Sequence, residues 1–159
     1  MKAVDEYRAL IERASNGDPD ARDFLTTLIH VAHVWDDLID GDKIVVPEQI
    51  HCAFEAALLW LPRNPFYQRH AGELNVLLQN SIRNWQLANE IERSRQIGLY
   101  PASFVLRSSY ADIVAQVAYI TGGPKLALTI GMEARSQAHA EGFEGYLTNL
   151  DAELAAREN

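Results

Sequence analysis

The 159-residue chain has little cysteine, no long apolar run and no excess of positive charge. Its single cysteine, Cys52, excludes an internal disulfide framework and is typical of a reducing compartment. No apolar stretch approaches the roughly 20 residues that span a bilayer. The N-terminal stretch MKAVDEYRALIERA also lacks the apolar core of a signal peptide. We therefore expect a cytoplasmic protein with no membrane partner.

Basic residues are scarce, since 14 Lys and Arg stand against 22 Asp and Glu and give a net charge of −8. The one loose basic group, Arg83, Arg93 and Arg95, is diluted by Glu90 and Glu92. Nucleic-acid binding depends on neutralising phosphates, so we expect no nucleic-acid partner. A negative surface suits a basic protein partner instead.

The common catalytic and metal-binding motifs are also missing. The chain has no P-loop, no dinucleotide fingerprint, no H-E-x-x-H, no CxxC pair and no Glu-x-x-His repeats of ferritin-like bundles. Cys52 directly follows His51, and neighbours in a helix point apart, so a thiol–imidazole pair is not expected. No motif names a substrate.

Strand-like alternation is missing except over residues 43–46 (KIVV). Apolar residues at helical spacing, with proline and glycine at the boundaries, predict helices throughout the rest of the chain. The expected ranges are 4–14, 19–40, 47–61, 66–94 with a bend near Gly72, 101–121, 125–138 and about 141–157. With no repeat or dividing linker, residues 1–159 are predicted to form one all-α domain, a bundle of six or seven helices.

The last predicted helix carries a narrow apolar stripe. Phe143, Leu147, Leu150 and Leu154 follow a 4-3-4 spacing. Such a heptad-like stripe is expected to dock on the chain's own bundle or on a second copy, which would make a homodimer through this helix.

The stretch HVAHVWDDLIDGDK (residues 30–43) is the most unusual part of the sequence. His30, His33, Asp37 and Asp40 recur at a 3-4-3 spacing, which places them on one stripe nearly opposite the apolar arc of the helix, and Asp36 lies at its edge. One interpretation is a solvated face. The other is a stripe lining a cavity that binds a divalent cation.

The metal interpretation assigns His33, Asp36, Asp37 and Asp40 as ligands. Carboxylates at i, i+3 and i+4 converge on a hard cation, so Mg²⁺ or Mn²⁺ is favoured over Zn²⁺. No Lys or Arg interrupts the stripe, whereas surface helices usually mix both charge signs. A bound cation would also reverse the repulsion between the carboxylates.

Other helices would have to supply supporting groups. In RSSYADIVAQVAYI apolar residues surround the helix, which predicts a buried Asp112 that needs a metal or a salt bridge, with Arg107 or Arg83 as the partner. Asn80 and Asn84 share one line of their helix and would orient metal ligands or hold a polar substrate. Trp85 is expected in the core or stacked on a ligand, and the other two tryptophans, Trp35 and Trp60, in the core.

Two resemblances extend these expectations. LIHVAHVWDDLIDGDK resembles the first aspartate-rich motif of class I isoprenoid synthases, with Asp36, Asp37 and Asp40 in the matching positions, which implies Mg²⁺ and diphosphate binding. The second metal-binding motif of that family fits Asn84, Ala88 and Glu92 only with alanine in place of serine.

The broader resemblance rests on HVWDDLIDGDK, LPRNPFY, QNSIRNWQLANEIE and RSSYADIV. Together these segments resemble small all-helical proteins of tailed bacteriophages. That resemblance implies a place in the host cytoplasm and an accessory or host-directed role, and it names no reaction.

Three hypotheses follow. The first is a metal-dependent hydrolase or lyase acting on a phosphate or diphosphate ester, in which the cation activates a water and Asp40 or Asp112 acts as catalytic base. The second is a noncatalytic accessory protein that works by binding another protein. A purely structural virion component is the third.

Overall fold

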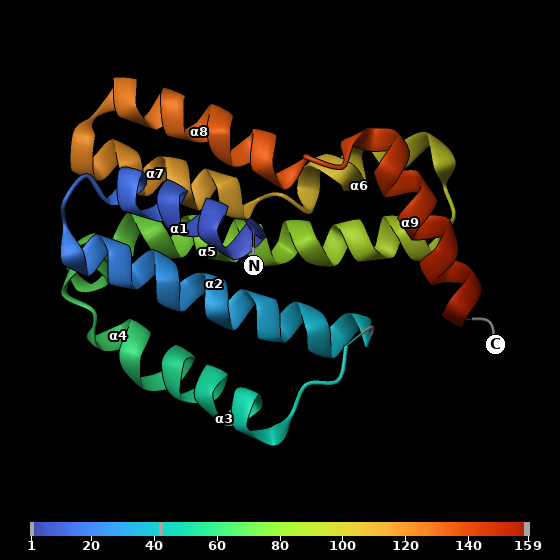
Figure 1. The fold of residues 1–159 in the computed structure, drawn as a ribbon, viewed down its shortest axis with the longest axis horizontal. Helices are drawn as coiled ribbons and strands as arrows, with labels where there is room; N and C mark the ends of the chain where they lie inside the picture. The colour runs from blue at the N-terminus through green and yellow to red at the C-terminus, as the bar shows by residue number, and fades with distance from the viewer. Residues whose placement is uncertain (1, 42, 158–159) are drawn as a thin grey trace.

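The computed structural model describes residues 2–41 and 43–157, with side chains from residue 7 to residue 155 except Asp42. The predicted all-α class is confirmed, and residues 43–46 are irregular, so the one possible strand was wrong. Figure 1 shows α7 (Tyr110–Gly122) and α8 (Pro124–Ala138) as one layer above α1 (Lys2–Ser15) and α5 (Pro65–Arg93). Below them lie α2 (Pro19–Asp40) and, outermost, α3 (Pro47–Glu55).

The boundaries of α2 agree with the prediction because both ends carry strong local signals. Asp18 Oδ1 accepts the backbone N–H groups of Asp20 and Ala21 at 2.9 and 3.1 Å, which satisfies donors that the first turn leaves unpaired. The helix ends at Gly41, whose φ of 67° suits glycine. Asp36, Asp37 and Asp40 therefore occupy the last two turns of α2.

The third predicted helix continues to Arg63, but in three parts. After α3 the chain forms a π-helix, η1 (Ala56–Trp60), and then α4 (Leu61–Arg63). Pro62 explains the wide turn: it has no N–H, and in a regular helix its ring would clash with the carbonyl of Leu58. The N–H of Leu61 instead reaches the carbonyl of Ala56, five residues back.

The long helix α5 bends at His70, whose φ and ψ are −119° and 16°, close to the bend predicted at Gly72. The single helix predicted from Pro101 to the TGGP segment was wrong. It is divided into α6 (Tyr100–Leu106), preceded by the short 3₁₀-helix η2 (Ile97–Leu99), and α7. Ser108 and Ser109 explain the division, because their hydroxyls donate to the carbonyls three residues back at 2.8 and 2.7 Å and compete with helical bonding.

Two apolar clusters hold the bundle. The main one joins α1, α2, α5, α7 and α8 around fully buried residues such as Phe24, Phe66 and Val117. The smaller one joins the end of α5 and α6 to α9 (Gly142–Arg157). The predicted stripe of α9 (Phe143, Leu147, Leu150 and Leu154) packs into this smaller cluster, so it docks on the chain's own bundle.

Within the described residues, no helix is both long enough and apolar enough to cross a membrane.

Candidate functional site

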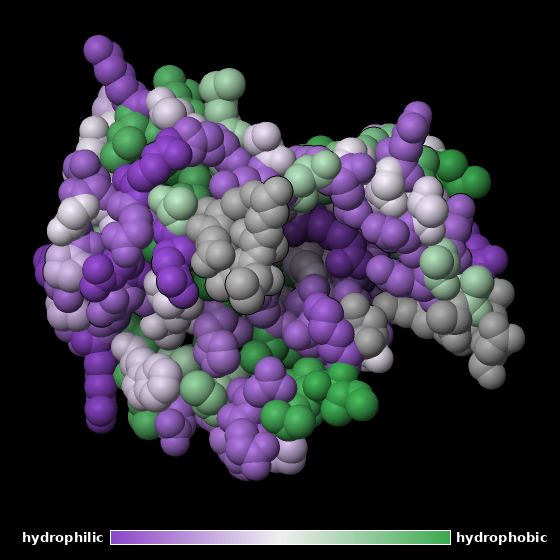
Figure 2. Space-filling view, viewed as in Figure 1, coloured by the Kyte–Doolittle hydropathy of each residue, from purple (hydrophilic) through white to green (hydrophobic). Residues whose placement is uncertain are grey.

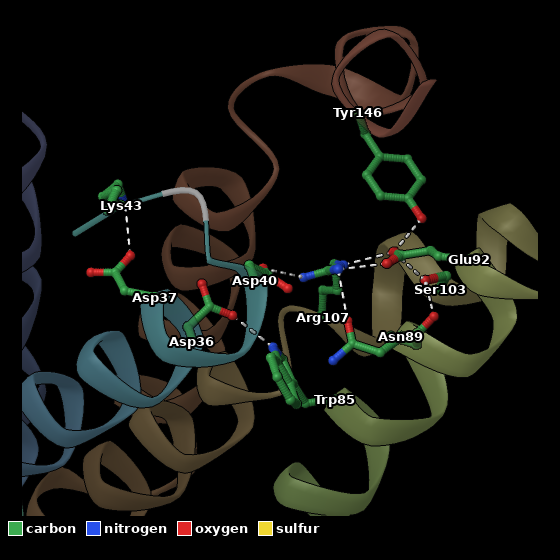
Figure 3. A network of polar contacts seen from close by, with 11 residues as sticks. Asp36, Asp37, Asp40, Lys43, Trp85, Asn89, Glu92, Ser103, Arg107 and Tyr146 are labelled. Atoms are coloured by element: carbon green, nitrogen blue, oxygen red, sulfur yellow. Dashed lines mark hydrogen bonds and ion pairs between the residues drawn. The ribbon is translucent and has the colours of Figure 1, made fainter. Parts of the chain in front are cut away.

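The acidic residues at the end of α2 each have a partner in the chain (Figure 3). Asp36 accepts the indole N–H of Trp85 at 2.9 Å. Asp37 points the other way and pairs with Lys43, with 2.8 Å between Oδ1 and Nζ. Asp40 faces Arg107, with 3.9 Å between Oδ2 and the guanidinium nitrogen. The acidic stripe is therefore divided between separate partners.

The histidines of the stripe also lie apart from these contacts. His33 is exposed and meets the ring of Tyr7 edge-on, with 6.2 Å between ring centroids. Nε2 of His30 is buried without a hydrogen-bond partner. In the part of the chain that the structure describes, no three His, Cys, Asp or Glu side chains are grouped so that they could hold a metal ion. The metal assignment of His33, Asp36, Asp37 and Asp40 thus gains no support from the geometry.

The centre of the polar network is an ion pair that the sequence did not point to. Arg107, in the turn between α6 and α7, donates through Nε and one terminal nitrogen to the two carboxylate oxygens of Glu92, at 2.6 and 2.5 Å. The same terminal nitrogen donates to the side-chain oxygen of Asn89 at 2.9 Å. Because Glu92 and Asn89 belong to α5, the pair fixes the turn against that helix.

Glu92 also receives two hydroxyl groups. Ser103 of α6 and Tyr146 of α9 each donate to Oε1 at 2.7 Å. The side chain of Glu92 is 4% exposed, so these donors replace the water that the carboxylate loses. Four donor groups from three elements beyond α5 therefore meet at one carboxylate, and we call Asn89, Glu92, Ser103, Arg107 and Tyr146 the Glu92 network (Figure 3).

The electrostatics of this network favour the charged forms of its central pair. Burial alone would raise the pKa of Glu92, but the hydrogen bonds from Arg107, Ser103 and Tyr146 outweigh it and lower the pKa. Burial alone would lower the pKa of Arg107, but Glu92, Asp40 and Asp36 outweigh burial and raise the pKa. The pair therefore stays ionised and intact at neutral pH.

The pKa of Asp36 is shifted in the direction opposite to that of Glu92. Burial raises its pKa, and the nearby charge of Asp40 adds to the effect, while the Trp85 hydrogen bond and Arg107 oppose it. Trp85 in turn packs against Trp35, with ring centroids 4.4 Å apart. The end of α2 is thus held to α5 by one indole–carboxylate bond and an aromatic contact.

The remaining predicted site residues lie elsewhere. Asp112 was expected to be buried, but its side chain is 47% exposed and pairs with Arg135 at 2.6 Å rather than with Arg107 or Arg83. That prediction was wrong because the polar face of α7 borders α8, which supplies the arginine. Asn84 donates to the hydroxyl of Ser109 at 2.9 Å, and Asn80 is exposed. Among the described residues, none of the three forms a hydrogen bond or ion pair with the stripe of α2.

A second candidate is an apolar surface. Trp60 was predicted to be a core residue, but it is 49% exposed, because η1 carries it to the edge of the outermost layer. Seven more large apolar side chains of residues 38–60 are also exposed. We call this set the 38–60 surface: Leu38, Ile39, Ile44, Val46, Phe54, Leu58, Leu59 and Trp60. Figure 2 shows apolar residues gathered at the lower right, over the start of α3 and the loop before it.

A shallow pocket adjoins this surface. It has a volume of about 310 Å³ and is lined by Trp60 and Arg63 on one side and by Asp23, Thr26 and Thr27 of α2 on the other. The space suits one large side chain.

Comparison of the chain with family models, with curated proteins and with solved structures finds no match. The resemblances to isoprenoid synthases and to phage proteins therefore remain predictions.

Proposed function

We propose that this protein is a noncatalytic protein-binding module whose contact area is the 38–60 surface. The observation that carries the proposal is the exposure of eight large apolar side chains within 23 residues, from the end of α2 to η1. Phe54 and Leu58, one turn apart, are 60% and 67% exposed, and Ile44 is 94% exposed. Large contiguous apolar patches on soluble proteins commonly mark sites of interaction.

The packing of α3 supports this proposal. The main tertiary contact of α3 and η1 is with α2, and their buried residues are the small Ala53 and Ala56. Of the larger apolar residues, Ile50 is half-buried, and Phe54, Leu58, Leu59 and Trp60 remain exposed. Burying one side chain of this size contributes about 1.5–3 kcal/mol when burial is complete, so covering several of them supplies enough free energy for specific binding.

The Glu92 network supports a noncatalytic role as well. Its carboxylate accepts four hydrogen bonds from within the chain, and the acidic residues of α2 also have internal partners. Attack on a phosphate ester would require carboxylates that converge on a cation or a water. Among the described residues, no group of carboxylates and histidines is arranged to hold a metal ion for the phosphate-ester reaction.

The proposal also bears on the possible partners. The stripe of α9 is covered by α5 and α6, which disfavours a homodimer through that helix. The resemblance to phage proteins directs the search to host proteins.

Site-specific photo-crosslinking tests the proposal. Benzoylphenylalanine would replace Leu58 in one variant and Leu128 of α8, 72% exposed, in a control variant. Irradiation in host cell extract is expected to give a discrete adduct from position 58 and none from position 128. The purified partner should then bind the double variant Phe54→Ser/Leu58→Ser at least about tenfold more weakly, the equivalent of 1.4 kcal/mol. Equal adducts at both positions, or unchanged affinity of the double variant, would contradict the proposal.

A further inference from the structure

The helix α3 carries two exposed carboxylates beside its exposed apolar residues. Glu48 and Glu55 are seven residues apart, which places them on the same face two turns from each other, and both are exposed. Phe54, directly before Glu55, and Leu58, three residues after it, are exposed as well. The exposed face of α3 and η1 is therefore apolar and acidic at once.

These two carboxylates differ from most acidic side chains in the molecule. Asp20 pairs with Arg69, Asp37 with Lys43 and Glu133 with Arg13. Across the described residues, Glu48 and Glu55 make no hydrogen bond or ion pair through their side chains. Their charges therefore remain available to a partner.

The surrounding segment shares the same sign of charge. Residues 36–63 contain six acidic residues (Asp36, Asp37, Asp40, Asp42, Glu48 and Glu55) and two basic ones (Lys43 and Arg63), a net charge of −4. The whole chain has a net charge of −8, so this short segment holds half of it. A positively charged partner would be attracted to this layer over a long range.

We propose that the 38–60 surface receives a basic amphipathic helix, whose apolar face covers Phe54 and Leu58 and whose Lys or Arg residues pair with Glu48 and Glu55. This inference rests on the proposed function and names the chemistry of its partner. An amphipathic helix laid on an apolar face is a common mode of peptide recognition, and basic residues one or two turns apart match the spacing of the two carboxylates.

A second copy of the chain fits the surface less well. Two copies related by a twofold axis present the same patch to each other. With two α3 helices packed antiparallel, Glu48 of each copy would approach Glu55 of the other, and like charges would meet across the contact. A basic segment turns both of these repulsions into attractions.

A binding titration with two designed peptides tests the inference. Both are 18-residue labelled helices with leucine at i, i+3, i+4 and i+7 positions; one carries lysine on the flanks and the other glutamate. Fluorescence anisotropy is expected to show the lysine peptide binding at least about tenfold tighter. Glu48→Gln/Glu55→Gln should weaken it about fivefold or more, as two ion pairs of ordinary strength predict. The matched control Glu144→Gln/Asp151→Asn removes two exposed carboxylates at the same spacing on α9 and should leave the affinity unchanged.

The possible failures are distinguishable. The basic partner is overturned if both peptides bind equally. It is also overturned if Glu48→Gln/Glu55→Gln and Glu144→Gln/Asp151→Asn weaken binding of the lysine peptide alike. In either case, weaker peptide binding by Phe54→Ser/Leu58→Ser would still support the apolar contact. If that apolar double variant binds as the wild type does, the proposed function itself fails. Self-association in light scattering that Phe54→Ser/Leu58→Ser abolishes would overturn the inference and make a second copy the occupant. Thermal melting of each variant checks its fold, since Glu48 also lies in the first turn of α3.

Discussion

At the scale of single residues, the buried carboxylate of Glu92 joins α5 to α6, to α9 and to the turn that carries Arg107. The sequence drew attention to Asp36, Asp37 and Asp40 because they are adjacent and acidic. Glu92 was noted only as a charge that offsets nearby arginines and as the last residue of an incomplete metal-binding motif, and Arg107 was expected as a partner of Asp112. The packing of α5, α6 and α9 decides which arginine pairs with which carboxylate. Helical spacing within one segment carries no information about that packing.

Replacing Glu92 by glutamine tests the strength of this pair. The amide cannot hold the Arg107 fork as a carboxylate does, so Glu92→Gln is expected to lower the free energy of unfolding by about 3 kcal/mol. Glu90→Gln on the same helix is the control, because Glu90 forms an exposed pair with Arg93 at 3.3 Å and should cost about 0.5 kcal/mol or less. Urea unfolding of both variants gives the comparison. Equal small losses would show that the Glu92 network contributes little.

Replacing Asp36 is expected to raise the stability of the fold, whereas replacing Glu92 lowers it. Its raised pKa means that the folded state disfavours the charged form, so its contribution to stability is present below its unfolded pKa and lost as pH rises through the folded one. Asp36→Asn keeps an oxygen for the Trp85 N–H and removes the repulsion from Asp40. The variant should therefore be more stable than the wild type at pH 7, by about 0.5 kcal/mol. The gain should vanish as the pH falls well below the ordinary aspartate pKa of about 3.9, because Asp36 is then neutral in both the folded and the unfolded state. A stability loss at pH 7 would contradict this account.

At the scale of elements, capping residues and prolines predicted boundaries well. Asp18, Pro19 and Gly41 mark both ends of α2, Pro47 opens α3 where expected, and α8 begins at Pro124, one residue before its predicted start. Two features were out of reach. The serine hydroxyls that end α6 act through competing local bonds, and η1 arises because Pro62 lies within a helix instead of ending it. The π-helix changes the direction of its own side chains, which accounts for the exposure of Trp60.

The division into two clusters predicts local unfolding. Leu150 is 4% exposed in the smaller cluster, so Leu150→Ala should cost about 2–4 kcal/mol and free α9 before the rest opens. Hydrogen exchange is expected to show lost protection in α9 with α7 unchanged. Val117→Ala in the main cluster is the control, and it should lower protection across α1, α7 and α8 together. Uniform loss in both variants would mean that the two clusters unfold as one.

At the scale of the whole molecule, the proposed binding role rests on two features: the polar network satisfied within the chain and the exposed apolar residues of the 38–60 surface. The all-α class followed from the sequence because hydrophobic spacing is a property of each segment. The 38–60 surface did not, because only the packing shows which of the apolar residues in this segment are left uncovered by other elements.

Divalent cations provide a test of the rival function at this scale. Since the acidic residues of α2 have separate partners, millimolar Mg²⁺, Mn²⁺ or Zn²⁺ should leave the Tm of the wild type and of Asp37→Ala unchanged. A cation that binds only the folded state raises its stability, so a metal site at the stripe would appear as a Tm increase in the wild type alone. That increase would restore the phosphoesterase hypothesis.

The most direct test of the central claim is amide hydrogen exchange of the full chain with and without the lysine peptide. Binding at the 38–60 surface predicts slower exchange over α3 and η1, with α8 unchanged. Protection confined to other helices, or none at saturating peptide, would contradict the assignment of this surface.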